Sequence, residues 1–482
     1  YSEASYPGAM DADTSLPGGV LLPATPSSYA LEPQRWFVLC GFCIFSCNQC
    51  LTWFTFSSTD QATMQGYFGS RMNKATIDML LNWGPVAGIL VFPLQAWMTS
   101  LRDGLRKGIW CGILLGFFGN ALRSGPVVVA ELTGDRSVAQ TEAAFLLYHL
   151  GQFLNAASGP MCMGTCTLLS VVWFDERERT TATAIAQTAN ALGSTIGFLN
   201  PLWLAPDAAG VPNMFYLGLV MSLVPVIFAL IYLPSGPKQF PSAAACAAAG
   251  EVVAIADCSR SPLSNARRSW VRSLIAASSS GASFVVLTMA AGILAGVLNA
   301  WQALLQSILN PAGIPDQEVA WIGFGNSIAG NTAALLSGAL MDRCCRRRLK
   351  GGIVMGLMGI LLCLLWFTLT LPCFLNGGGN PAPLRHTHLS LVFVCTVCGF
   401  SQGFADPLYF ELSAELLYPH RESVSAGILV AILNVTCLVM IQLNTMLTPD
   451  SMNFIATTAV AGVLAMVLLG VREVYQRPQN GE

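Results

Sequence analysis

Amide and indole side chains recur at helical spacing inside the hydrophobic runs of this sequence. Gln49 and Trp53 share one helix face, and so do Gln152 and Asn155. Such groups are costly within a membrane unless they line a cavity or find partners. They bind ligands by hydrogen bonding and stacking, which favours a small neutral or cationic aromatic or alkylammonium molecule over a phosphate or dicarboxylate. The candidate substrate-binding residues, for which hydrogen bonding between helices is the structural alternative, are Gln49, Trp53, Asn82, Gln152, Asn155, Gln187, Asn299, Trp301, Gln302 and Gln402.

Three carboxylates could carry protons across the membrane. Asp406, Glu411 and Glu415 lie along one predicted helix. A carboxylate held in a low-dielectric environment can take up a proton near neutral pH, which proton coupling requires. Glu411 is favoured over Glu415 because it lies one turn farther from the predicted helix end. The alternative is that Arg123 or the cytoplasmic arginines pair with these carboxylates in structural or gating salt bridges.

A short signature occurs twice, about 240 residues apart. Residues 174–182 read FDERERTTA and residues 418–426 read YPHRESVSA, with an aromatic residue, Arg-Glu and Ala at matching places. Charged loops that begin at Asp103 and Asp342 recur with nearly the same offset. Duplicated halves are typical of secondary transporters, in which such loops control the conformational equilibrium. The candidate gating residues are Asp103, Arg106, Arg123, Arg177, Glu178, Asp342, Arg343, Arg421 and Glu422.

The elements that position these side chains follow from the composition. The chain is 54% hydrophobic and only 10% charged, which is typical of a membrane protein. A spanning helix needs roughly 17 to 25 apolar residues. The sequence predicts an all-α membrane protein with spans at 36–57, 77–100, 108–130, 142–172, 180–204, 213–234, 283–309, 318–341, 351–373, 389–414, 422–447 and 453–471.

The spans divide the chain into two six-helix bundles. We predict a disordered N-terminal tail at 1–34, bundles at 35–234 and 283–474, a linker at 235–282 and a C-terminal tail at 475–482. With the N-terminus inside, the cytoplasmic segments carry most of the 24 Lys and Arg residues, which places both termini and the linker in the cytoplasm.

Several functions are disfavoured by the sequence. The net charge of -2 and the lack of a basic domain argue against a nucleic-acid partner. Cys40, Cys43, Cys47 and Cys50 form one helical stripe, which cannot converge on a metal ion by itself. No nucleophile and base pair is visible, so we expect no enzyme activity, no cofactor and no metal. We expect a monomer in contact with lipids, a small-molecule substrate and protons.

Longer motifs resemble a known family. Gly151-Gln152-x-x-Asn155-x-x-x-Gly159-Pro160, the segment 173–186 and the segment 410–419 resemble the feline leukaemia virus subgroup C receptor-related transporters, solute carrier family 49 of the major facilitator superfamily. The resemblance extends from about residue 35 to residue 473. It implies a twelve-helix major facilitator fold in which two pseudo-symmetric bundles alternate around a midplane cavity.

Motifs such as Trp83-Gly84-Pro85 and 366–370 resemble the disrupted-in-renal-carcinoma branch most. That resemblance implies proton-driven transport of pyridoxine, the vitamin B6 alcohol, in lysosomes. The receptor-related branch implies choline and ethanolamine transport, or haem export, with an aromatic cage on helices one and seven. Trp53 matches the first cage position, but Asn299 occupies the second. We therefore expect pyridoxine-type transport at the lysosomal or plasma membrane; the alternatives are choline and ethanolamine transport, haem export, and a transporter-like nutrient sensor or receptor.

Overall fold

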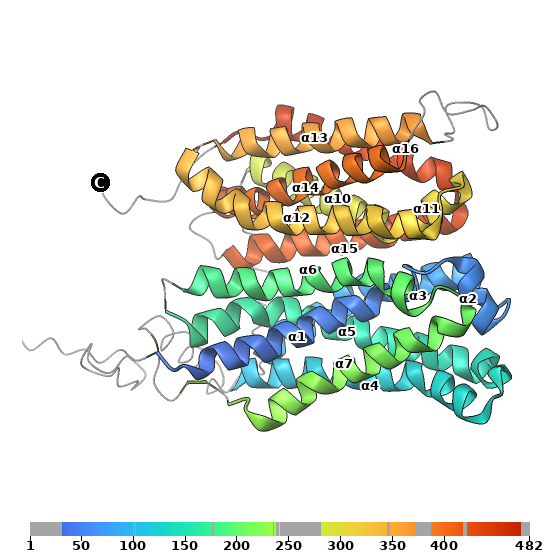
Figure 1. The fold of residues 1–482 in the computed structure, drawn as a ribbon. Helices are drawn as coiled ribbons and strands as arrows, with labels where there is room; N and C mark the ends of the chain where they lie inside the picture. The colour runs from blue at the N-terminus through green and yellow to red at the C-terminus, as the bar shows by residue number, and fades with distance from the viewer. Residues whose placement is uncertain are drawn as a thin grey trace, which may run out of the picture.

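The chain folds into long helices arranged in two bundles (Figure 1). The computed structural model describes residues 31–99, 101, 103–175, 178–234, 236–237, 241, 281–344, 348–371, 387–417 and 422–473. Most of the predicted tails and of the linker lie outside these residues. The N-terminal half contains α1 (Gln34–Phe54), α2 (Gln61–Phe68), α3 (Lys74–Thr99), α4 (Gly104–Thr133), α5 (Glu142–Trp173), α6 (Arg179–Leu204) and α7 (Val211–Ile231). The C-terminal half contains α10 (Ala282–Ala303), α11 (Leu305–Leu309), α12 (Asp316–Cys344), α13 (Leu349–Thr370), α14 (His388–Leu417), α15 (Glu422–Met446) and α16 (Pro449–Gly470).

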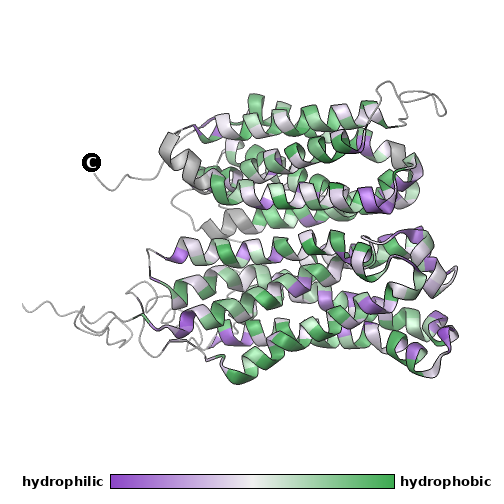
Figure 2. Ribbon diagram, viewed as in Figure 1, coloured by the Kyte–Doolittle hydropathy of each residue, from purple (hydrophilic) through white to green (hydrophobic). Residues whose placement is uncertain are grey.

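The predicted all-α fold with twelve long helices is confirmed. All of these helices except α2 and α11 are at least 21 residues long. Within the described ranges, ten helices are long and apolar enough to cross a membrane. Figure 2 shows hydrophobic residues along the middle of the helices and more hydrophilic residues near their ends. This distribution suits a bilayer, because the apolar middle of each helix can lie in the hydrocarbon core, which is about 30 Å thick.

The two bundles lie side by side and meet along two helix pairs. Helix α6 packs against α12, and α3 packs against α15. We call the end of the molecule where α1 begins and α16 ends the terminal end, and the end that carries α2 and α11 the far end (Figure 1).

Small residues let helices within a bundle approach closely. A Cβ atom added at Gly399 would lie 2.0 Å from the Asn326 carbonyl oxygen, and one at Gly403 would lie 1.9 Å from the Gly330 carbonyl oxygen. Glycine on α14 therefore permits backbone contact with α12, as is common where membrane helices pack tightly.

Two features at the far end differ from the predicted spans. The predicted run 283–309 is divided into α10 and α11 at Leu304, which has φ -97° and ψ 5°. The short helix α2, which the hydrophobic pattern did not indicate, begins after Asp60. The Asp60 carboxylate caps α2 by accepting hydrogen bonds from the backbone of Ala62 and Thr63 at 2.8 and 3.1 Å.

Candidate functional site

An amide cluster joins three helices of the N-terminal half. The Asn155 side-chain amide on α5 donates to the Gln49 carbonyl oxygen on α1 at 3.1 Å. The Gln49 amide donates in return to the Asn155 carbonyl at 3.4 Å, and Asn190 of α6 donates to the Gln49 Oε1 at 3.2 Å. Asn155 is fully buried, whereas Gln49 and Asn190 are partly exposed. The cluster therefore both fixes the helices and presents amide groups at a partly open face.

Trp53 lies one turn beyond Gln49 on α1 and is held from two sides. Its indole N–H donates to the Leu81 carbonyl oxygen of α3 at 3.1 Å. Its own carbonyl oxygen accepts a hydrogen bond from the Gln152 amide of α5 at 3.1 Å. The indole lies against Gly84, where an added Cβ atom would be only 2.4 Å from the indole nitrogen. The partly exposed ring is therefore held in a fixed orientation, as a stacking surface requires.

Replacing Gly84 by alanine is expected to reduce transport severely, because the new methyl group must displace the Trp53 indole. The matched control is Gly125→Ala, since nothing lies within 4 Å of a Cβ atom added there. Uptake at equal amounts of folded protein measures the effect. Similar uptake by the two variants would show that the orientation of Trp53 is unimportant.

Arg123, a predicted gating residue, makes hydrogen bonds and no salt bridge with any residue that the structure describes. Its guanidinium is fully buried and donates to the Thr52 carbonyl, the Gln152 Oε1 and the Thr55 hydroxyl at 2.9, 2.7 and 2.8 Å. It also lies over the rings of Phe56 and Phe215, at 5.2 and 5.0 Å from their centroids. In the described conformation, α4 turns Arg123 into the core of its own bundle, away from the α14 carboxylates.

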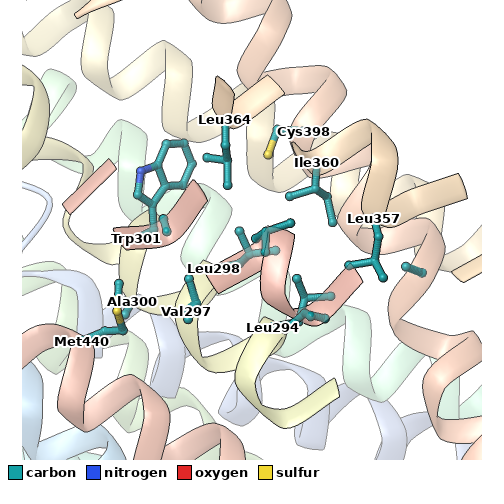
Figure 3. Close-up of a cluster of buried hydrophobic side chains, with 14 of the residues drawn as sticks. Leu294, Val297, Leu298, Ala300, Trp301, Leu357, Ile360, Leu364, Cys398 and Met440 are labelled. Carbon is teal, nitrogen blue, oxygen red and sulfur yellow. The ribbon is translucent and has the colours of Figure 1, made fainter. Parts of the chain in front are cut away.

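Trp301, which the sequence predicted to contact the substrate, lies in the core in the described conformation. Its side chain is 2% exposed and packs in the core of the C-terminal half, near Leu298 and Leu364 (Figure 3). The indole N–H donates to the Asn453 Oδ1 at 2.8 Å, and the ring makes an edge contact with Phe367. The helical rotation between neighbouring residues directs Trp301 into the core, whereas Asn299 and Gln302 remain partly exposed.

The other predicted polar residues divide by burial. Asn82 of α3 is buried, and its Oδ1 accepts no hydrogen bond from the part of the chain that the structure describes. On α14, Gln402 and Asp406 are partly exposed one turn apart, and the Gln402 side chain hydrogen-bonds the Asp406 carboxyl. Gln187 and Glu411 are exposed, while Glu415 is partly exposed.

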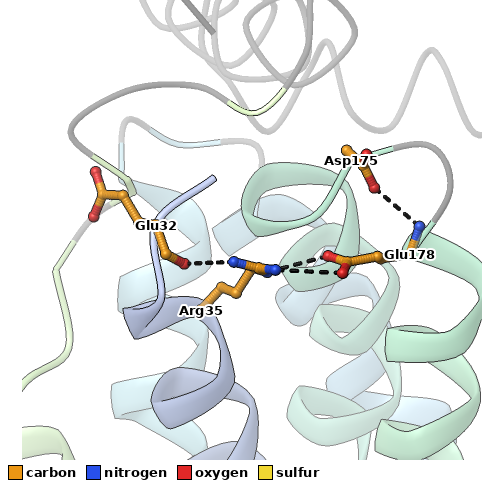
Figure 4. A network of polar contacts seen from close by, with 4 residues as sticks. All are labelled: Glu32, Arg35, Asp175 and Glu178. Carbon is orange, nitrogen blue, oxygen red and sulfur yellow. Dashed lines mark hydrogen bonds and ion pairs between the residues drawn. The ribbon is translucent and has the colours of Figure 1, made fainter. Parts of the chain in front are cut away.

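Apart from Arg123, the predicted gating residues whose side chains the structure describes lie at the terminal end. Glu178 forms an ion pair with Arg35, with an N–O distance of 3.1 Å, and so joins the start of α6 to α1 (Figure 4). This pair lies within one bundle rather than between the two halves. Asp103, with φ 58°, and Arg106 are exposed at the start of α4. Arg177 and Arg421, and the side chains of Asp342, Arg343 and Glu422, lie outside the described residues.

A buried carboxylate joins the two halves near the far end. Asp78 of α3 is 2% exposed and accepts two hydrogen bonds from the Asn444 amide of α15, each 3.1 Å long. The Thr445 hydroxyl donates to the same carboxylate at 3.0 Å. Because Asp78 belongs to one half and both donors belong to the other, these bonds form only when the halves meet here.

A second contact closes the far end between α2 and α11. The Asn310 amide donates to the Asp60 Oδ1 and to the Asp316 Oδ1, at 2.9 Å in each case. The Gln306 amide also donates to the Asp316 Oδ1, at 2.5 Å. Midway along the helices, the Thr195 and Ser327 hydroxyls lie 2.7 Å apart and join α6 to α12. The described conformation is therefore closed at the far end.

Comparison with known proteins decides the family. The family model described as Major Facilitator Superfamily matches residues 37–441. The chain belongs to this superfamily. It is a multi-pass membrane transporter, and the prediction of a transporter fold is confirmed.

The relatives that resemble this chain align with most of its length. A solute carrier family 49 member 4 homolog of Xenopus laevis is 29% identical over 461 residues, covering 91% of this chain and 91% of that protein. The human choline/ethanolamine transporter FLVCR2 is 28% identical over 424 residues, covering 84% and 70% of the two chains. The predicted resemblance to solute carrier family 49 is therefore confirmed. The xylose transporter XylE from E. coli, in a partially occluded inward open conformation, shares the fold with a TM-score of 0.63 at 13% identity, over 93% of this chain and 100% of that chain.

The sequence analysis did not identify the residues that join the two halves at the far end. Asp78 lies just inside a predicted span, so the cost of a carboxylate there was a usable signal. Its partner Asn444 is 366 residues away, and no local pattern indicates that pairing. Asp60 could have been recognised as a helix cap, because Asp commonly precedes the first turn of a helix.

Proposed function

We propose that this transporter moves a small polar organic molecule, neutral or singly positive and of the pyridoxine type, by alternating access. The observation that carries the proposal is the partly exposed pairing of the Gln49 amide cluster with the indole of Trp53. Amides supply donors and acceptors to hydroxyl groups and to a ring nitrogen, while the indole supplies a face for stacking. Arg123, which hydrogen-bonds Thr52 and Gln152 beside this cluster, is fully buried.

Choline or ethanolamine is the second candidate. It is favoured by a relative whose name gives these two molecules as substrates, and by Trp53, which suits a cation as well as a ring. Asn299 argues against choline, because this amide stands where the family resemblance predicts a second aromatic residue. An amide binds a hydroxyl group but provides no π face for a quaternary ammonium.

Uptake into proteoliposomes by the purified chain separates these candidates. The panel is radiolabelled pyridoxine, choline, ethanolamine and haem, each with and without a pH gradient, and empty liposomes give the background. We expect pyridoxine to accumulate and to compete with its own unlabelled form. Accumulation of choline in preference to pyridoxine would replace the first candidate by the second. Specific binding of a ligand without uptake would instead favour a sensor or receptor.

We also propose that a proton moves with the substrate and that Asp406 carries it. Asp406 is partly buried beside Gln402, whereas Glu411, which the sequence favoured, is exposed. The argument from desolvation therefore applies better to Asp406.

By the distribution of Lys and Arg, the terminal end faces the cytoplasm and the far end faces the lumen or the outside.

The Asp406→Asn variant is expected to lose the stimulation of uptake by a pH gradient. It should retain the exchange of labelled for unlabelled substrate, because exchange requires only the loaded transporter to reorient. Glu411→Gln is the matched control and should keep its response to the gradient. A normal response in Asp406→Asn would favour diffusion of the substrate down its own gradient.

A further inference from the structure

The far end contains a cavity that the central substrate site does not include. Its volume is about 360 Å³, and both halves of the transporter line it. Asp60, Lys74 and Asp78 come from the N-terminal half, whereas Gln306 and Asn310 come from the C-terminal half. Pro311 also lines the cavity and is exposed, so the cavity can be reached from solution while the far end is closed.

The polar lining of this far-end cavity is rich in hydrogen-bond acceptors. Gln306 is 9% exposed and uses its amide N–H on Asp316, while its Oε1 accepts no hydrogen bond from a described residue. The Asn310 Oδ1 is buried and is likewise without a donor in the described chain. A buried amide oxygen without a donor is costly unless a ligand or water supplies an N–H or O–H group.

The charge of the lining favours a cation. Asp60 and Asp78 contribute two negative charges against one positive charge from Lys74, and Asp316 lies next to Gln306 and Asn310. Lys74 makes no ion pair with any residue in the described ranges, so it offsets the negative charge without neutralising either carboxylate. A small ion that carries both N–H donors and positive charge satisfies the oxygens and the net charge together.

We propose that this far-end cavity is a second ligand site, which binds a small organic cation with a primary ammonium group. The ligand contacts both halves, so it binds only the conformation that is closed at the far end and stabilises that conformation. Such a ligand, supplied from the far side, slows the return to the far-open state and so inhibits transport. This proposal does not depend on which solute the central site carries.

The test uses the purified full-length chain and two cations of equal charge, methylammonium and tetramethylammonium, titrated by saturation-transfer NMR. Methylammonium has N–H donors and should bind, whereas tetramethylammonium has none and should bind at least about tenfold more weakly, as expected for lost hydrogen bonds to a charged group. Equal binding of the two cations would overturn the proposal.

Two variants locate the bound cation, because one should weaken its binding and the other should tighten it. Gln306→Leu should weaken methylammonium binding about tenfold, because it removes an acceptor from the lining of the cavity. Lys74→Gln should tighten binding by about threefold or more, because it removes a nearby positive charge. A misfolded variant cannot produce tighter binding. Gly84→Ala disturbs the central site and should leave methylammonium binding unchanged. Loss of binding in Gly84→Ala, with no change in the other two variants, would place the cation in the central site and refute the far-end site.

Discussion

Replacing Arg123 by leucine is expected to destabilise the N-terminal half by about 3 kcal/mol or more, because three buried acceptors each lose a hydrogen bond from a charged donor at a cost of about 1 kcal/mol or more. Those acceptors are the Thr52 carbonyl, the Thr55 hydroxyl and the Gln152 Oε1. Gln152 also holds the backbone of Trp53, so the loss should extend to the substrate site. Denaturant unfolding in mixed micelles measures the change in stability.

Arg123→Lys is the matched control. Lysine keeps the positive charge between the rings of Phe56 and Phe215 but cannot reproduce the planar fork of donors. Its stability should therefore lie between those of the wild type and of Arg123→Leu. If Arg123→Leu unfolded at the wild-type denaturant concentration, the buried guanidinium would not hold the N-terminal half together.

Replacing Asp78 by alanine is expected to favour the far-open state by about 1 to 3 kcal/mol, a typical coupling energy between conformational states. The variant loses the hydrogen bonds from Asn444 and Thr445, which exist only when the halves meet at the far end. Ala303 lines the far-end cavity and is 3% exposed, so a cysteine placed there reports opening. In the Ala303→Cys background, Asp78→Ala should raise the rate of labelling by a membrane-impermeant maleimide.

The control for this labelling is Asp135→Asn. Asp135 is also acidic, but among the described residues its side chain hydrogen-bonds the nearby Ser137, which lies in the same half. The Asp135→Asn substitution should leave the labelling rate of Ala303→Cys unchanged. The chain without the added cysteine gives the background labelling of native thiols. Equal labelling rates with and without the Asp78→Ala substitution would mean that this contact does not hold the far end closed.

The helices could be predicted from the sequence because the bilayer imposes a strong local requirement. Each span must be long and apolar, and the duplicated signatures at 174–182 and 418–426 place the halves in register. The shared helix face of Gln49 and Trp53 was likewise a local property. In the structure, the Gln49 amide hydrogen-bonds α5 and the Trp53 indole hydrogen-bonds α3.

The sequence did not show how each helix is rotated or which residues it contacts. Trp301 and Gln302 are neighbours in the sequence, and only the packing of α10 against α13 and α16 decides which of them enters the core. The break at Leu304 and the pairing of Asp78 with Asn444 depend on tertiary contacts. Hydrophobic periodicity carries no information about such distant partners, because it records only one segment at a time.

The central claim is that transport requires the far end to open and close as the two halves rock. Asp60 and Asn310 contact each other across the far end at 2.9 Å, and they come from opposite halves. Cross-linking the double variant Asp60→Cys, Asn310→Cys with a short, reducible thiol reagent in proteoliposomes should therefore abolish uptake, and reduction should restore it. Each single variant treated with the same reagent is the control for reaction at native cysteines. Uptake at the uncrosslinked rate in the fully cross-linked double variant would contradict transport by alternating access through this far end.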